Sequence, residues 1–219
     1  MTFGAVFPRV FRPAYGPGLA SAAAGGVDWS TWFTYLWDAK NAASQAASYV
    51  DLIAAQTMTV TVAPTWAAGT GWTGTGTQYL KTGITAASGV SMMVRYSGVP
   101  LSGVQCAAGS SGSGNTRLLL HAYHGSFAAA LYGQGGFVTV APGLTGGVLA
   151  VSAQQGYRNG SAEGGAIAAW SGTGFEIYVL ARNNSGTASE FLSGSVQAIG
   201  IKNGTISNVS AAYAAMAAL

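Results

Sequence analysis

The stretch FEIYVLARNNSGTASEFLSGSVQAIGI, residues 175–201, carries the clearest fold signal in the chain. Phe175, Ile177 and Val179 fall on one face of an extended strand. Glu176, Tyr178 and Leu180 fall on the other face. A loop of small residues then leads to a second β-like segment, FLSGSVQAIGIKNG, residues 191–204. The stretch therefore predicts two β-strands whose Phe175, Ile177 and Val179 side chains face a core.

The segments before this stretch repeat the same pattern. TMTVTV, residues 57–62, alternates with a period of two, and residues 71–84, 89–99, 115–125 and 146–160 follow as further β-like segments. Clusters of Gly, Ser, Asn and Pro separate them. Asn159-Gly160 predicts a two-residue hairpin turn, and Asn203-Gly204 is a second candidate. Many short strands joined by such turns indicate an all-β antiparallel sandwich or barrel.

The C-terminal segment ISNVSAAYAAMAAL, residues 206–219, changes character. Ala, Met and Leu favour a helix, which Ser207 or Asn208 could cap. Val209, Tyr213 and Met216 then form an apolar stripe that would dock on the sandwich. Residues 28–56 are ambiguous: WSTWFTYLWD fits a buried strand or a short helix, and NAASQAASYVDL fits a short helix or a loop.

Residues 1–27 are interpreted as an N-terminal arm, and residues 28–219 as the sandwich domain. Pro8 and Pro13 disfavour a helix in the arm. Its aromatic and basic side chains fit two alternatives, an anchor that inserts into a partner and a strap over the protein's own core. The candidate attachment or oligomerisation residues are Phe3, Phe7, Arg9, Phe11, Arg12 and Tyr15.

Several segments together resemble the concanavalin A-like, laminin-G-like jelly-roll modules of bacteriophage structural proteins. The residues concerned are GTQYLKTGI, SMMVRYSG, GYRNG at 156–160, the stretch at 175–201 and AAYAAMAAL at the end. The resemblance covers about residues 57–219. It implies two packed antiparallel sheets at a virion surface, in a tail fibre, head fibre or decoration protein. Other virion proteins, further copies of the chain (a trimer is one candidate) and a host-surface glycan are the partners that it implies.

The composition narrows the class of function. Only 7% of residues are charged and the formal net charge is +3, with the basic residues scattered singly. We therefore expect no nucleic-acid binding, which needs a basic stripe. The uncharged stretch 126–157 is broken by glycines and Pro142, so we expect no membrane insertion. A surface so poor in charge is typical of proteins that pack against other chains.

The acidic residues argue against hydrolysis of glycosidic bonds, which uses a pair of carboxylates. The six acids are dispersed, and no two lie within five residues of each other. Retaining hydrolases of the resembled fold carry their acids close together on one strand, and that motif is missing. Glu163 with Glu176 is the one pair that we would check for a contact across strands. We expect a protein that is not an enzyme.

We expect no metal and no cofactor, because no Asp-x-Asn or Asp-x-Asp cluster is present. His121 and His124 are three apart in HAYH, so on a strand they should point to opposite faces and not share a metal. The single cysteine, Cys106, is interpreted as a small buried hydrophobe.

Carbohydrate binding without catalysis needs only an aromatic platform and a few polar groups. Such groups could also be packing or protomer-contact residues. The favoured hypothesis is an adhesive virion structural protein; a secreted or cell-surface carbohydrate-binding module and a divergent glycoside hydrolase are the alternatives. The candidate binding residues are His121, Tyr123, Trp170, Glu176, Tyr178, Arg182 and Asn183.

Overall fold

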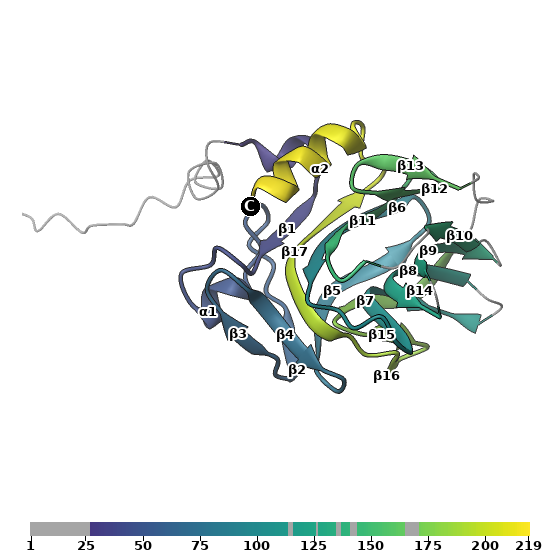
Figure 1. Ribbon diagram of the computed structural model, residues 1–219. Coiled ribbons are helices and arrows are strands. Elements are labelled where there is room, and N and C mark those ends of the chain that lie inside the picture. Colours follow the sequence, from purple (N-terminus) through teal and green to yellow (C-terminus); the bar gives the residue numbers. More distant parts are fainter. Residues whose placement is uncertain (1–26, 114–115, 126, 135–136, 141–143, 165–170) are drawn as a thin grey trace, which may run out of the picture.

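The structure is a computed structural model that describes residues 27–113, 116–125, 127–134, 137–140, 144–164 and 171–219. Trp170 and the candidate attachment residues of the arm lie outside these ranges. Within them the chain forms two stacked β-sheets and a short C-terminal helix (Figure 1). The predicted all-β sandwich is therefore confirmed.

The first sheet, here called the β17 sheet, has eight described strands. β1 (Tyr35–Asp38) pairs with one edge of β17, alongside β4. The path across the sheet is β13 (Ser161–Glu163), β12 (Gln155–Arg158), β11 (Gly147–Ser152), β6 (Val90–Ser97), β17 (Ser193–Asn203), β4 (Gly71–Thr75) and β3 (Thr65–Ala67).

The second sheet, here called the β7 sheet, has nine described strands. Its described pairs are antiparallel except that β15 runs parallel to β7. The hairpin of β15 (Arg182–Asn184) and β16 (Thr187–Ser189) is attached to β7. The path is β10 (Phe137–Val140), β9 (Phe127–Gln134), β8 (Thr116–His124), β7 (Val104–Ser111), β14 (Gly172–Val179), β5 (Tyr79–Ala87) and β2 (Thr59–Val62).

The main core lies between the two sheets, where Trp37, Trp72, Leu118, Ile177 and Ile199 are fully buried. The alternation expected at Ile177 and Val179 is confirmed, but Phe175 is only half-buried and does not belong to this core, because the pairing of β14 with β5 is irregular around it. Leu180 is an exception, because it also enters this core instead of the opposite face. Its φ of 67° turns the chain at the end of β14, so the period of two stops there.

A second core covers the outer face of the β17 sheet. The helix α2 (Val209–Ala218) packs there together with the 3-10 helix η2 (Trp29–Thr31), as the helix lying across the sheet in Figure 1 shows. Asn208 caps α2 by accepting a hydrogen bond from the amide of Ala211 at 3.0 Å. Val209 and Met216 are buried and Tyr213 is half-buried, which confirms the predicted docking stripe.

Residues 28–56, which the sequence left open, contain both kinds of structure. WSTWFTYLWD divides into η2 and β1, and NAASQAASYVDL contains the four-residue helix α1 (Gln45–Ser48). Leu36 of β1 faces the second core, on the outer face of the β17 sheet, while Trp37 faces the core between the two sheets. This segment thus contributes to both cores of the domain.

The two predicted turns differ. Asn159 and Gly160 have φ values of 48° and 81°, as a type I′ turn requires, so this prediction is confirmed. A Cβ at Gly160 would lie 2.6 Å from the Tyr213 ring, so packing also demands glycine. Asn203-Gly204 is not a hairpin: β17 ends at Asn203 and the chain continues to α2. Among the described residues, no helix is long and apolar enough to span a membrane.

Candidate functional site

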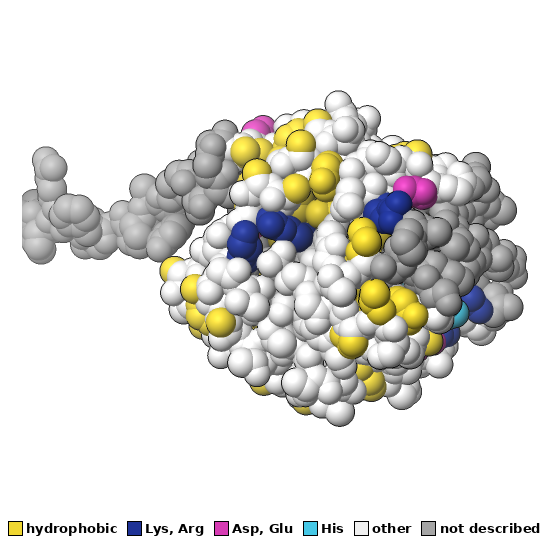
Figure 2. All heavy atoms as spheres, viewed as in Figure 1, with side chains coloured by type: hydrophobic (Ala, Val, Ile, Leu, Met, Phe, Trp, Pro, Cys, Tyr) yellow, Lys and Arg dark blue, Asp and Glu magenta, His cyan; other side chains and the backbone are white. Residues whose placement is uncertain are grey.

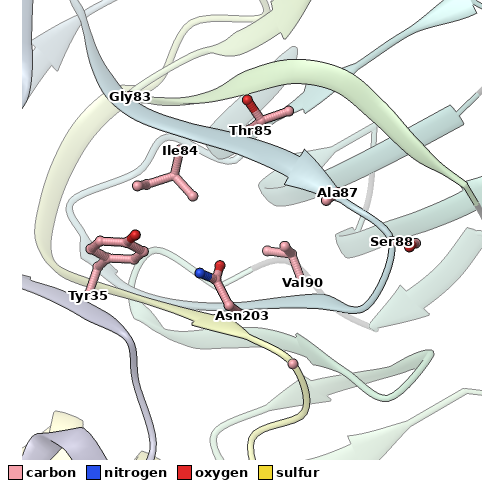
Figure 3. Close-up of a pocket in the computed structure, with 9 residues that line it drawn as sticks. Tyr35, Gly83, Ile84, Thr85, Ala87, Ser88, Val90 and Asn203 are labelled. Carbon is pink, nitrogen blue, oxygen red and sulfur yellow. The ribbon is translucent and has the colours of Figure 1, made fainter.

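A groove of about 380 Å³ opens between the two sheets near the end of β17 (Figure 3). We call it the inter-sheet groove. β5 belongs to one sheet and β6 to the other, and the short turn that joins them closes one side. The residues that line the groove are Tyr35, Gly83, Ile84, Thr85, Ala87, Ser88, Val90, Asn203 and Gly204.

The floor of the groove is apolar. Ile84 points from β5 toward the opposite strands in Figure 3 and packs against the inter-sheet core. Val90 is 4% exposed and begins β6, where it pairs with Asn203 of β17. Ile84 of β5 and Val90 of β6 are both packed into the core. The two sheets, and not loops alone, therefore fix the shape of the groove.

Tyr35 forms one side wall of the groove. It begins β1, pairs with Ile201 of β17, and is half-buried. Its ring is stacked on Trp37, with centroids 6.0 Å apart and an interplanar angle of 18°. Trp37 is fully buried and its Nε1 donates to the carbonyl of Tyr49 at 3.1 Å. The Tyr35 ring is therefore a supported aromatic surface.

The groove is lined by polar side chains but by no charged one. The hydroxyls of Tyr35, Thr85 and Ser88 and the side-chain amide of Asn203 have no hydrogen-bond partner among the described residues. None of the lining residues is ionisable near neutral pH. Hydroxyl and amide groups can both donate and accept, so they suit a neutral ligand that carries many hydroxyls.

Two of the sequence-predicted residues meet elsewhere, on the face of the β7 sheet that points away from the inter-sheet core. Glu190 joins them: its Oε2 lies 2.9 Å from Nε2 of His121, and its Oε1 accepts from Nη1 of Arg182 at 2.5 Å. Arg182 Nε also donates to Ser111 Oγ at 2.8 Å. Glu190 was not predicted, because its eight-residue separation from Arg182 across a hairpin carries no sequence signal.

The electrostatics of this triad are strongly perturbed. Burial lowers the pKa of His121, against the opposing effect of its hydrogen bond to Glu190. Burial alone would raise the pKa of Glu190, but His121 and Arg182 outweigh it and lower that pKa to about 2. At neutral pH the triad therefore holds a carboxylate between a guanidinium and a neutral imidazole.

The expectation that His121 and His124 point to opposite faces is wrong. Their ring centroids lie 5.2 Å apart. The pairing of β8 with β9 is irregular between His121 and His124, so the strict alternation of the strand is lost there. Within the described part of the chain, no group of three His, Cys, Asp or Glu side chains could hold a metal ion.

The β15–β16 hairpin accounts for three more candidates. Tyr178 and Asn183 are only 3% and 2% exposed. The Tyr178 hydroxyl donates to the carbonyl of Gly186 at 3.3 Å, and Asn183 Nδ2 donates to the carbonyl of Glu176 at 2.8 Å. These side chains therefore position the hairpin, and Glu176 beside them is half-buried. Their role in binding a ligand stays a prediction.

The remaining candidates are dispersed. Tyr123 is half-buried, and its hydroxyl donates to the carbonyl of Gly125 at 2.8 Å. Cys106 is fully buried, as expected, and burial raises the pKa of its thiol. The predicted set therefore does not converge on one pocket. The inter-sheet groove was missed because its polar residues come from β1, β5, the following turn and β17, with no motif to connect them.

Comparisons with known proteins agree with the fold. No protein-family model and no curated protein matches the sequence. Among solved structures, the chain is similar to Trypanosoma rangeli sialidase in complex with 2,3-difluorosialic acid, with a TM-score of 0.58 and 12% identity over 84% of this chain and 33% of that one. A mutant of that sialidase displaying trans-sialidase activity has a TM-score of 0.58 and 13% identity, over 86% and 34%. The chain thus spans about a third of these proteins, and the similarity concerns the fold.

Proposed function

We propose that this protein is a non-catalytic, carbohydrate-binding β-sandwich that holds a neutral saccharide in the inter-sheet groove. The observation that carries the proposal is the groove's combination of a supported Tyr35 ring with unpartnered hydroxyl and amide groups and no charge. A sugar ring presents an apolar face of C–H groups to an aromatic side chain and hydroxyls at its rim. The walls of the groove carry groups suited to both kinds of contact.

The proposal does not include hydrolysis, because the acids are dispersed over the described structure and, Glu176 excepted, each is already held by a hydrogen bond or an ion pair. Both oxygens of Asp51 accept backbone hydrogen bonds, and those of Asp38 accept from Asn41. Glu163 lies on β13 of the β17 sheet and is ion-paired with Arg158, whereas Glu176 lies on β14 of the β7 sheet. A paired acid and base for glycoside chemistry is therefore not expected.

A glycan array containing neutral and acidic oligosaccharides tests the proposal, followed by calorimetric titration with the strongest neutral ligand. Tyr35→Ala should weaken binding about tenfold, as expected for loss of an aromatic contact worth about 1–1.5 kcal/mol. Asn203→Ala should also weaken it, and its exposed side chain makes misfolding a minor concern.

Tyr123→Ala is the matched control, because Tyr123 is another half-buried tyrosine outside the groove. This variant should bind the neutral ligand as tightly as the unchanged protein does. Loss of binding in Tyr123→Ala with full binding in Asn203→Ala would move the site to the region predicted from sequence. No binding to any saccharide on the array would overturn the proposal.

The biological setting stays a proposal that rests on the sequence resemblance alone. In it, the sandwich stands at a virion surface and residues 1–27 attach it to other virion proteins or to further copies of the chain. Sedimentation of the full chain, compared with a chain lacking residues 1–26, tests the role of the arm. A stable monomer in both cases would speak against it.

A further inference from the structure

A second groove, also about 380 Å³, lies on the opposite side of the β17 sheet, beside α2. We call it the α2 groove. Tyr213 and Ala217 of the helix form one wall, and the start of β11 at Gly147 forms the other. Polar side chains from β6, β17 and the Asn159-Gly160 turn line the rest. This groove shares no lining residue with the inter-sheet groove.

Arg95 is the charged residue of the α2 groove. Its Nη1 donates to the carbonyl of Met216 in the last turn of α2 at 3.1 Å. Its other N–H groups have no partner among the described residues, and no described carboxylate lines the groove. A guanidinium can only donate hydrogen bonds, so it presents unused donors and a positive charge.

Asn159 adds a donor of defined direction. Its Oδ1 accepts from the amide of Val148 at 2.9 Å, and its own backbone amide donates to the carbonyl of Val148 at 2.8 Å. These two bonds orient the side chain, and Nδ2, a donor only, is left without a partner among the described residues. Asn159 is thereby committed to donating toward any ligand.

The charges around the groove also favour a ligand that accepts hydrogen bonds. The carbonyl end of α2 would by itself repel an anion. However, Arg95 covers the carbonyl of Met216, and Lys40 Nζ donates to that of Leu219 at 2.9 Å. Figure 2 shows the resulting gathering of Lys and Arg side chains below the helix. Of the described acids, Asp38 is hydrogen-bonded to Asn41 and Glu163 is ion-paired with Arg158, and neither lines the groove.

From this donor excess we infer that the α2 groove binds a carboxylate-bearing ligand, with the carboxylate held by Arg95 and Asn159. Gln197 and Ser97, whose side chains have no partner among the described residues, are placed to bind hydroxyls next to it. The groove is therefore suited to an acidic sugar, in contrast to the uncharged inter-sheet groove. This inference is independent of the proposed neutral-saccharide site.

Glucuronate, glucose and acetate are suitable probes, because glucose lacks only the carboxylate and acetate lacks the sugar. Each is titrated into the ¹⁵N-labelled protein, and the backbone amide signals of Gly146 and Gly147 report the α2 groove while those of Gly83 and Gly204 report the other. Glucuronate should shift the first pair at concentrations where glucose does not. A failure at one groove is thus distinguishable from a failure at the other.

Asn159→Asp is the most informative variant. It keeps the oxygen that accepts from Val148, and Asp tolerates the positive φ of 48°. It replaces the free donor with a negative oxygen, so glucuronate affinity should fall about tenfold or more. Arg95→Gln should have a similar effect, and Lys202→Gln, which removes one positive charge from the end of β17 near Ser30, should not.

The outcomes separate cleanly. Glucuronate binding tighter than acetate assigns an acidic sugar, and equal binding assigns a simple carboxylate; both support the carboxylate site. Glucose shifting Gly146 and Gly147 as strongly as glucuronate would overturn the inference. So would unchanged glucuronate affinity in both Asn159→Asp and Arg95→Gln, provided that their melting temperatures show folded protein.

Discussion

Nε2 of His121 lies 2.9 Å from Oε2 of Glu190, which connects the centre of β8 to the residue that follows β16. Arg182 binds the other carboxylate oxygen, and the backbone carbonyl of Glu190 accepts from the amide of Cys106 at 3.0 Å. The carboxylate thus fastens both ends of the β15–β16 hairpin to the outer face of the β7 sheet.

Acidification should destabilise the protein over a wide range of pH. His121 has a folded-state pKa below its ordinary 6.5, so the unfolded chain takes up the proton first and stability falls as the pH drops below 6.5. Glu190 has a pKa of about 2 against 4.5, so its contribution is present above pH 4.5 and is lost as the pH falls toward 2. Urea unfolding measured between pH 7.5 and 3 should show a steady decline in the free energy of unfolding.

The variant His121→Gln separates the two contributions to that decline. Glutamine keeps a hydrogen-bond donor but does not titrate. The pH dependence between 6.5 and 4.5 should therefore shrink, while the dependence below 4.5 should persist. An unchanged slope in the upper window would show that His121 is not the group responsible.

Arg182→Leu should destabilise the fold by about 1–3 kcal/mol, because it leaves a largely buried carboxylate with one partner fewer. The side chains of Arg182 and Glu190 are 19% and 27% exposed. Lys202→Leu removes the same charge where the ammonium makes only a 3.4 Å exposed hydrogen bond, and should change stability by less than about 0.5 kcal/mol. Equal effects in the two variants would refute a special role for Arg182.

Gly200→Ala should destabilise the protein by about 1–3 kcal/mol through overpacking. A Cβ at Gly200 would lie 2.5 Å from the Phe33 ring, and Phe33 is 1% exposed and has little room to move. Gly69→Ala is the comparison: nothing lies within 4 Å of the Cβ that the alanine would add, but the φ of Gly69 is +79°. It should cost about 1 kcal/mol from backbone conformation alone, and thermal unfolding would rank the two.

Cys106 should not react with a thiol reagent in the folded protein. Its side chain is fully buried and burial raises its pKa, so the thiolate is scarce and inaccessible. Ellman's reagent should detect one thiol per chain in denaturant and almost none in native buffer. Rapid labelling under native conditions would mean that β7 opens locally.

Local sequence patterns were enough to predict the all-β class, the Asn159-Gly160 turn, a C-terminal helix capped at Ser207 or Asn208, and the inward faces of β14 at Ile177 and Val179. These features depend on neighbours in the chain: the period of two in a strand, the positive φ values of a tight turn and the acceptor at a helix start. Local alternation failed at Leu180 and between His121 and His124, where a positive φ and a register irregularity interrupt the strands.

The places where polar groups meet depend on how the two sheets pack. Glu190 reaches His121 across 69 residues of chain, and Tyr35 meets Asn203 across a groove that two different sheets form. Such juxtapositions follow from strand order and sheet packing, which no local pattern encodes. The same physics explains why Tyr178 and Asn183, polar and promising in sequence, became buried supports: Asn183 is part of the β15–β16 hairpin, and that hairpin folds back onto Tyr178 and β14.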